Sequence, residues 1–186
     1  MNIGLLGFGV VGGGVWELAQ ENRALNVKKV LVRREAPPLG KAAVQDVEAI
    51  LRDTDIDTVV EVLGGLHPAY EWICRALAAG KDVVTANKAV ISAYYRELTA
   101  LACENRVALR CTAAVGGGIP WLVNLQRCRR VDTVTEVGGI MNGTTNFIMD
   151  AMHKSPVDFP AILKEAQDLG YAEADPSADI DGDDIR

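Results

Sequence analysis

Aromatic residues are scarce in this sequence: three Trp, four Tyr and three Phe make up 5% of its 186 residues. A core must therefore come mainly from Val, Leu, Ile and Ala, which suits parallel sheets whose strands are buried on both faces. Histidine and cysteine are few as well, and the two His and four Cys form no CxxC pair or other zinc-like spacing. We expect reduced cysteines with a packing role in a cytoplasmic protein, and no zinc site.

Long apolar runs and positively charged leaders are also missing, so neither a signal peptide nor a transmembrane span is expected. The net charge is −6, which argues against nucleic acid and against an anionic membrane as the main partner. The best candidate for a basic patch that could bind such a partner is Arg127, Arg129 and Arg130. A solvated helix end is the simpler interpretation of these three arginines. A hydrophobic content of 49% with 24% charged residues is ordinary for a soluble globular protein.

Apolar runs alternate with helical patterns over the first two-thirds of the chain, which predicts a mostly parallel, doubly wound α/β sheet with right-handed crossovers. The expected strands are Asn2–Leu6, Val27–Val32, Thr58–Leu63, Asp82–Thr85 and Val107–Cys111. The expected helices are Val10–Asn22, Val44–Arg52, Pro68–Ala79 and Ile91–Glu104. Gly80 follows the third helix, where a left-handed cap is expected.

The pattern changes after about Val115. The expected elements there are a helix at Ile119–Cys128, a strand at Val131–Met141, and helices at about Thr144–His153 and Phe159–Leu169. One strand cannot form a sheet. We therefore expect a first domain over residues 1–114 and an incomplete α+β domain over residues 115–186.

The first turn carries the pattern GxGxxG, as Gly7-Phe8-Gly9-Val10-Val11-Gly12. A hydrophobic strand precedes it and an amphipathic helix follows, which is the context of a Rossmann-type dinucleotide site. The first glycine permits the tight turn, the second lets the backbone approach a diphosphate, and the third lets helix and strand pack closely. The diphosphate then meets the free N–H groups at the positive end of the helix.

The end of the second strand should select between the nicotinamide cofactors. An acidic residue there would accept a hydrogen bond from the ribose 2′-hydroxyl. This strand instead ends Val32-Arg33-Arg34 before Glu35, and a guanidinium pairs well with a 2′-phosphate. We expect NADP to be preferred over NAD through Arg33, with two solvated arginines as the competing interpretation.

Later segments carry a resemblance. Gly64-Gly65-Leu66-His67-Pro68-Ala69, Val84-Thr85-Ala86-Asn87-Lys88 and Gly116-Gly117-Gly118-Ile119-Pro120 resemble homoserine dehydrogenases in order and spacing. Asn142-Gly143-Thr144-Thr145-Asn146 and Gly170-Tyr171-Ala172-Glu173-Ala174-Asp175-Pro176 extend the likeness over essentially the whole chain. The resemblance implies an oxidoreductase that interconverts L-homoserine and L-aspartate 4-semialdehyde with NAD(P), towards threonine and methionine.

The resemblance also implies roles for individual residues. Lys88 and Asp184 match catalytic positions. The residues implied to line the amino-acid site are Gly143, Thr144, Tyr171, Glu173 and Asp179. Cofactor contacts are implied at Gly64, Gly65, Asn87, Lys88 and Gly170. Without the resemblance, Lys88 would be interpreted as a solvated lysine at a helix start and the acids as solvated loop residues.

Two departures from the family pattern affect these expectations. Relatives place an acid/base lysine four residues after the position of Asp184, which would be residue 188. We therefore expect this chain to bind cofactor but to turn over homoserine poorly, and the full-length protein to be a homodimer. Relatives also often bind sodium or potassium through a glutamate and backbone carbonyls. Thr112 takes the place of that glutamate, so carbonyls of Val115, Gly117 and Ile119 would form a weakened cation site.

Three alternatives stay open. The chain could be a related amino-acid dehydrogenase of the same fold, which substrate assays would separate. It could be a non-catalytic nicotinamide-nucleotide-binding module, which would bind cofactor without turnover even when extended. Finally, Ser177–Gly182 partly imitates a calcium-binding loop, although a Ser stands at its first position.

Overall fold

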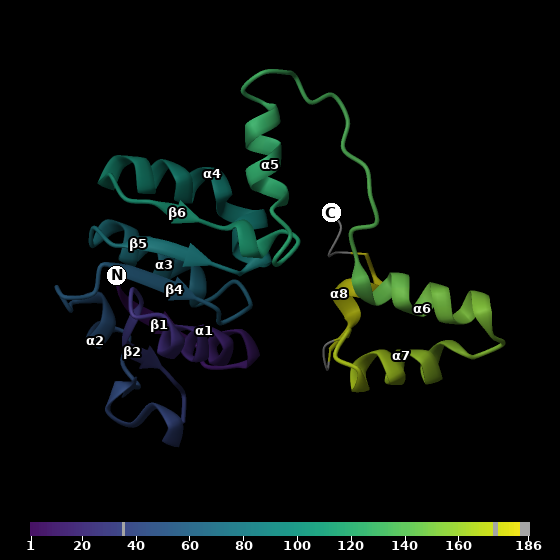
Figure 1. Cartoon of the computed structure of the whole chain (residues 1–186), viewed down its shortest axis with the longest axis horizontal. Helices are drawn as coiled ribbons and strands as arrows, with labels where there is room; N and C mark the ends of the chain where they lie inside the picture. Colours follow the sequence, from purple (N-terminus) through teal and green to yellow (C-terminus); the bar gives the residue numbers. More distant parts are fainter. Residues whose placement is uncertain (35, 173–174, 183–186) are drawn as a thin grey trace. The chain divides into compact units, whose positions relative to one another are not determined.

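A computed structural model describes residues 1–34, 36–172 and 175–182. The chain forms two compact units, Met1–Val131 and Asp132–Arg186. Figure 1 shows a layered α/β arrangement in the first unit and a cluster of helices in the second.

The first unit is built on a six-stranded sheet in which every pair of neighbouring strands is parallel. Its strands are β1 (Asn2–Leu6), β2 (Asn26–Leu31), β3 (Ala43–Val44), β4 (Thr58–Glu61), β5 (Asp82–Thr85) and β6 (Leu109–Arg110). The spatial order is β3-β2-β1-β4-β5-β6. The order reverses between β1 and β4, which is where doubly wound sheets bind ligands beyond the carboxyl ends of the strands.

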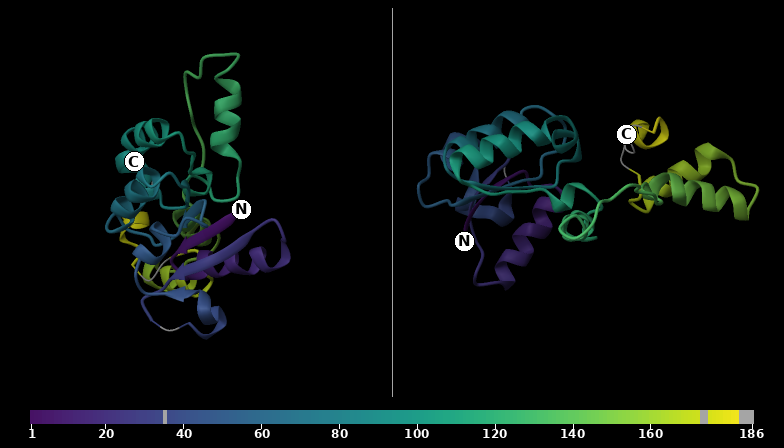
Figure 2. Two further views of the ribbon diagram at one scale, coloured as in Figure 1. Left: turned by 90° about the vertical axis from the view of Figure 1, so that its left-hand side faces the viewer. Right: turned by 90° about the horizontal axis from the view of Figure 1, so that it is seen from above.

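Helices cover both faces of this sheet (Figure 2). The helices of the unit are α1 (Val10–Glu21), α2 (Glu48–Leu51), α3 (Ala69–Ala78), α4 (Lys88–Asn105) and α5 (Trp121–Cys128), with 3-10 helices η1 (Pro37–Ala42) and η2 (Thr112–Ala114). Side chains alternate along the strands: Ile3 and Leu5 pack with α1, whereas Leu6 packs with α2, α3 and α4. Both resulting cores are almost wholly aliphatic, as the scarcity of aromatic residues predicted.

The predicted strands and helices of this unit are confirmed, although the bounds of most of them differ from the prediction by one to four residues. The bounds of β1 and β5 match the prediction, and Gly80 adopts the expected left-handed conformation with φ of +75°. The predicted helix Val44–Arg52 is shorter, because Val44 pairs with Leu31 as part of β3. Helix α4 begins earlier than predicted, at Lys88, because Asn87 caps it.

The first compact unit ends at Val131, later than the boundary expected near Ala114. Helix α5 accounts for the difference, since it contacts η2 and belongs with the sheet. None of the residues of α5 is buried.

The secondary structure elements among the described residues of the second unit are all helices, and residues 133–142 have no regular secondary structure, so the strand predicted over Val131–Met141 is wrong. The apolar and β-branched residues there resemble a strand, but no neighbouring strand among the described residues offers a hydrogen-bonded ladder. Helices α6 (Gly143–Lys154) and α7 (Phe159–Asp168) confirm the two predicted helices, and a short helix α8 (Ser177–Ile180) follows. Ile148, Ile162, Ala166 and Ala172 form the small core.

Candidate functional site

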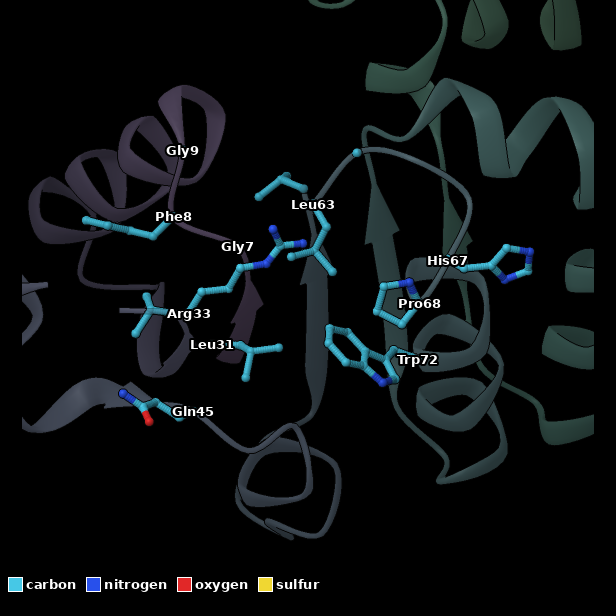
Figure 3. A pocket seen from close by; sticks show the side chains of 13 residues that line it. Gly7, Phe8, Gly9, Leu31, Arg33, Gln45, Leu63, His67, Pro68 and Trp72 are labelled. Atoms are coloured by element: carbon cyan, nitrogen blue, oxygen red, sulfur yellow. The ribbon is translucent and has the colours of Figure 1, made fainter. Parts of the chain in front are cut away.

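A cavity of about 520 Å³ lies at the carboxyl ends of the central strands of the first unit. Figure 3 shows the Arg33 side chain reaching across from the end of β2 towards Leu63, with Trp72 and Pro68 on the other side. The residues that line the cavity are Gly7, Phe8, Gly9, Leu31, Val32, Arg33, Gln45, Val62, Leu63, Gly64, His67, Pro68 and Trp72. The cavity therefore joins the glycine turn to the loop that follows β4, at the reversal point of the sheet.

The glycine turn is packed too tightly for other residues at two of its three glycines. Gly7 has φ of +106°, which side-chain-bearing residues rarely adopt. A Cβ atom on Gly12 would lie 2.4 Å from the carbonyl oxygen of Gly7. Gly9 differs, because a Cβ built on it would meet no protein atom within 4 Å. The protein's own packing therefore requires the first and third glycines, whereas the second leaves open space beside the cavity.

Helix α1 begins beside this open space. Val10 and Val11 form its first residues and expose 95% and 55% of their surface. The first N–H groups of a helix have no intrahelical acceptor, and they carry the positive end of the helix dipole. No acidic residue lies in the first turn to neutralise it. The turn therefore has room, donors and favourable charge for a diphosphate.

Gly64 and Gly65 lie in the loop after β4, with φ of +77° and +70°. Neither has a protein atom within 4 Å of a constructed Cβ, so the backbone is accessible there. The Asn87 side chain fixes this loop, because its Nδ2 donates to the Gly65 carbonyl at 2.7 Å. Its Oδ1 accepts from the Val90 N–H at 3.1 Å and caps α4. Lys88 follows as the first residue of α4 and is exposed.

Sequence reasoning missed two buried polar residues beneath these loops. Glu61 ends β4 and Thr85 ends β5, and both are fully buried. The Glu61 carboxylate accepts from the Thr85 hydroxyl at 2.6 Å and from the Leu63 N–H at 2.8 Å. The signal that could have found them is a polar residue closing each of two apolar strands, Thr58-Val59-Val60-Glu61 and Asp82-Val83-Val84-Thr85.

A second group of polar side chains surrounds the start of α3. His67 lines the cavity, and its Nδ1 lies 2.6 Å from Oε1 of Glu71. A hydrogen bond from its own backbone amide, and then the contact with His67, hold the pKa of Glu71 below its ordinary value. The hydroxyl of Tyr70 donates to Glu97, which raises the pKa of Tyr70. No motif in the sequence singles out these pairs.

The candidate cation residues lie in tight turns at the end of the sheet. Gly117 has φ of +57°. The Ile119 carbonyl accepts from the Trp121 N–H at 2.8 Å, and the Val115 N–H donates to the Thr112 carbonyl at 3.2 Å. A carbonyl oxygen has two lone pairs, so the hydrogen bond to Ile119 leaves one for a cation.

In the second unit, the segment Asn142–Thr145 forms the start of helix α6. Asn142 caps α6, because its Oδ1 accepts from the Thr145 N–H at 2.8 Å. Its Nδ2 donates to Asp179 at 2.7 Å. Buried Thr144 donates its hydroxyl to the Tyr171 carbonyl at 2.6 Å, so this hydroxyl has a structural partner. Gly143 is the first residue of α6, where an N–H lacks an intrahelical acceptor.

Tyr171 connects this cluster to α7. Its ring stacks on Phe147 with centroids 4.8 Å apart, yet 56% of the residue is exposed. Gly170 precedes it with φ of +79°, in the turn after α7. The structure therefore brings Gly143, Thr144, Tyr171 and Asp179 of the predicted amino-acid site into one cluster. Glu173 and Asp184, and Glu35 next to the arginines of β2, lie outside the described residues.

The described residues contain no group of three His, Cys, Asp or Glu side chains placed to hold a metal ion. Residues Ser177–Ile180, part of the calcium-like stretch, form the short helix α8. All four cysteines are free. Among the helices that the structure describes, none is long and apolar enough to cross a membrane.

Two family models match the chain in succession. Residues 7–112 match the model of the homoserine dehydrogenase NAD-binding domain, and residues 120–186 match the homoserine dehydrogenase model. Curated relatives include homoserine dehydrogenases of Synechocystis, 44% identical, and of Bacillus subtilis, 40% identical, each aligned over 98% of this chain and 45% of its own length. The chain thus spans about 45% of the length of these relatives.

Solved structures give the same result. A homoserine dehydrogenase from Thiobacillus denitrificans superposes with a TM-score of 0.89 at 38% identity, over all of this chain and 46% of that one. A hyperthermophilic archaeal homoserine dehydrogenase in complex with NADPH superposes with a TM-score of 0.85 at 26% identity, over 99% of this chain and 66% of that one. With the glycine turn inside the first matched region and the Asn142 cluster inside the second, the chain belongs to the homoserine dehydrogenase family.

Proposed function

We propose that this chain carries the nicotinamide-nucleotide site and part of the substrate site of an enzyme that interconverts L-homoserine and L-aspartate 4-semialdehyde, in the synthesis of threonine and methionine. The observation that carries the proposal is the glycine turn. Gly12 packs against Gly7 while open space faces Gly9 and the start of α1, which fits a diphosphate. Membership of the family supplies the reaction.

Residues of the first unit bind and orient the cofactor. The residues assigned to this role are Gly7, Phe8, Gly9, Val10, Val11, Gly12, Arg33, Gly64, Gly65, Asn87 and Lys88, with Gly170 in the second unit. Arg33 lines the cavity, and its guanidinium suits a 2′-phosphate, which favours NADP over NAD. The nicotinamide, when bound, gives or takes the hydride.

Residues of the second unit hold the amino acid. Gly143 presents a helix-start N–H group to the substrate carboxylate, and Thr144 stabilises the loop of Tyr171 through its hydrogen bond to that carbonyl. Glu173 and Asp179 offer carboxylates to the substrate ammonium. Lys88 and Asp184 are the proposed catalytic residues, and Lys88 donates a hydrogen bond to the oxygen at which charge develops.

The remaining proposals concern the cation, the assembly and the compartment. Carbonyls of Val115, Gly117 and Ile119 form a weak site for sodium or potassium, because Thr112 contributes no charge. The full-length protein is proposed to be a cytoplasmic homodimer acting on a small-molecule substrate, without nucleic acid or membrane as a partner. The 186-residue chain by itself is proposed to bind cofactor but to turn over homoserine poorly.

Calorimetric titration of the chain with NADPH and NADH tests the cofactor site. We expect Arg33→Ala to weaken NADPH binding about tenfold while leaving NADH unchanged, since one charge-assisted contact is lost. Arg34→Ala is the matched control, because Arg34 is also exposed but does not line the cavity. Absence of binding to either nucleotide by the folded chain would contradict the proposal.

A spectrophotometric assay with homoserine tests the reaction. We expect an extended chain that includes residue 188 and the segment beyond it to be active, and the 186-residue chain to be at least a hundredfold slower, a loss within the contribution of one general acid/base group. Cofactor binding without turnover by the extended protein would instead favour the non-catalytic nucleotide-binding module.

A further inference from the structure

A buried carboxylate connects the two loops on one side of the cofactor cavity. Glu61 is the last residue of β4, and its side chain lies against β5, where it is paired in register with Thr85. Both residues are completely buried, and Asn87 is 5% exposed. A buried charged side chain is costly unless hydrogen bonds satisfy it, so the partners of the Glu61 carboxylate decide whether it is tolerated there.

Hydrogen-bond donors surround the Glu61 carboxylate. Oε2 accepts from the Thr85 hydroxyl at 2.6 Å, and Oε1 accepts from the Leu63 N–H at 2.8 Å. Oε1 also accepts a longer bond, 3.4 Å, from Nδ2 of Asn87. An ionised carboxylate accepts only, so these donors suit the charged form.

The same contacts determine the course of two loops. The Leu63 N–H lies in the segment that lines the cavity, so the bond to Glu61 orients the backbone there. Asn87 then holds the Gly65 carbonyl and caps α4, directly before Lys88. Gly64 and Gly65 have positive φ values and little packing of their own, so they depend on such bonds for a fixed conformation.

The position of this network indicates which part of a dinucleotide it affects. Doubly wound sheets hold a dinucleotide across the reversal point, with one nucleotide over each half of the sheet. Arg33 follows β2 and lies in the half of the sheet that contains β1, β2 and β3, where its guanidinium suits the adenosine 2′-phosphate. Glu61 and Thr85 are the last residues of β4 and β5, in the other half, over which the nicotinamide nucleotide would lie.

We propose that Glu61 is a positioning residue for the nicotinamide half of the cofactor, acting through Thr85, Asn87 and the Leu63–Gly65 backbone. This inference rests on the proposed nicotinamide-nucleotide binding. It assigns a role to Glu61, a residue that touches neither nucleotide but determines the shape of the part of the site that binds the nicotinamide half.

The test compares two ligands by calorimetry: NADPH, and adenosine 2′,5′-bisphosphate, which contains only the adenosine half. Glu61→Gln keeps the size of the side chain but turns one acceptor into a donor. We expect it to weaken NADPH binding about tenfold, the effect of roughly one lost hydrogen bond, and to leave adenosine 2′,5′-bisphosphate unchanged. A purely structural role would weaken both ligands together or neither.

A second pair of variants covers the case in which Glu61→Gln does not fold. Thr85→Val removes the hydroxyl but keeps the shape, and we expect the same selective loss. Thr85→Ser returns the hydroxyl and should restore most of the affinity. Asp57→Asn is the matched control, because Asp57 is a hydrogen-bonded carboxylate immediately before the opposite end of β4.

The outcomes separate the positioning role from the proposed function. If the native chain binds NADPH while Glu61→Gln and Thr85→Val keep native affinities, or lose both ligands equally, the positioning role is wrong and the proposed function stands. If the native chain binds neither ligand, the proposed function is wrong and the positioning role with it.

Discussion

Substitution of Gly12 by alanine tests the packing of the glycine turn most directly. The new Cβ would lie 2.4 Å from the Gly7 carbonyl oxygen and 3.0 Å from its carbon. An ordinary contact begins near 3.4 Å, so helix α1 must move away from the turn by about 1 Å. The neighbour is backbone, so it cannot rotate out of the way as a side chain could.

The energetic cost follows from two opposing effects. Overpacking of this kind costs roughly 1–3 kcal/mol. Alanine favours a helix over glycine by about 1 kcal/mol, which offsets part of the cost. We expect Gly12→Ala to lower the free energy of unfolding by up to about 2 kcal/mol. Displacement of the first turn should also weaken NADPH binding by about tenfold to a hundredfold, because hydrogen bonds to a charged diphosphate are each worth roughly 1.5–3 kcal/mol.

Gly14→Ala is the matched control. Gly14 lies in the same helix, and a Cβ there meets no protein atom within 4 Å. It should raise the free energy of unfolding by about 0.5–1 kcal/mol, through helix propensity alone, and leave NADPH binding unchanged. Urea unfolding and calorimetry measure both quantities. Equal stability and equal affinity of Gly12→Ala and the native chain would refute the proposed packing of helix against turn.

Three further substitutions give separate expectations. Asn142→Asp keeps an oxygen that caps α6, but it removes the Nδ2 donor to Asp179 and places a second carboxylate beside that residue. Thermal unfolding should therefore show a loss of about 1–3 kcal/mol in the stability of the second unit. An unchanged melting temperature would contradict the role of that contact. Lys81→Met removes the Nζ donor from the carbonyls of Asp53 and Ile56, although the Asp53 carbonyl keeps the Ile56 N–H at 3.2 Å, and should cost about 2 kcal/mol in urea unfolding. Asp57 has a pKa below its ordinary 3.8, held there first by the Asn2 N–H, so its stabilisation is present above that pH and is lost as pH falls through the lowered pKa. The stability difference between the native chain and Asp57→Asn should therefore shrink in acid, and a difference independent of pH would argue against it.

The parts of the fold that the sequence predicted are those coded by local patterns. Strand β1 is an apolar run between the start of the chain and a glycine turn, so its bounds followed directly. Strand β3 has two residues and exists only because it pairs with Val30 and Leu31. The expected strand over Val131–Met141 failed for the same reason, since its pattern cannot reveal whether a partner strand is present.

The same distinction applies to the candidate site. The glycine turn would act through its backbone N–H groups, and the spacing of its glycines along the chain indicates it, so it could be found without a structure. Glu61 and Thr85 lie 24 positions apart, and only the register of β4 against β5 brings them together. A lone polar residue at a strand end has many explanations until its neighbour is known. The residues of local motifs that are proposed to contact a ligand were therefore predictable, whereas the residues that hold those motifs in place were not.

An asparagine at a helix start has the same role in both units: one amide atom accepts a hydrogen bond to cap the helix, while the other donates a hydrogen bond to a distant segment. Other capping residues could not fill this role. Asn87 and Asn142 each use Oδ1 to cap a helix, and each uses Nδ2 to hold a distant segment, which is the loop at Gly65 for Asn87 and helix α8 at Asp179 for Asn142. Aspartate would cap the helix but has no proton to donate, and serine has only one polar atom for two directions. Since both helix starts carry residues proposed to bind ligand, Lys88 and Gly143, the second bond of each asparagine couples the position of a helix end to the segment that it holds. The asparagine at each of these positions is therefore required by two bonds at once, and a substitution that preserves only the cap should leave the capped helix intact while releasing that segment.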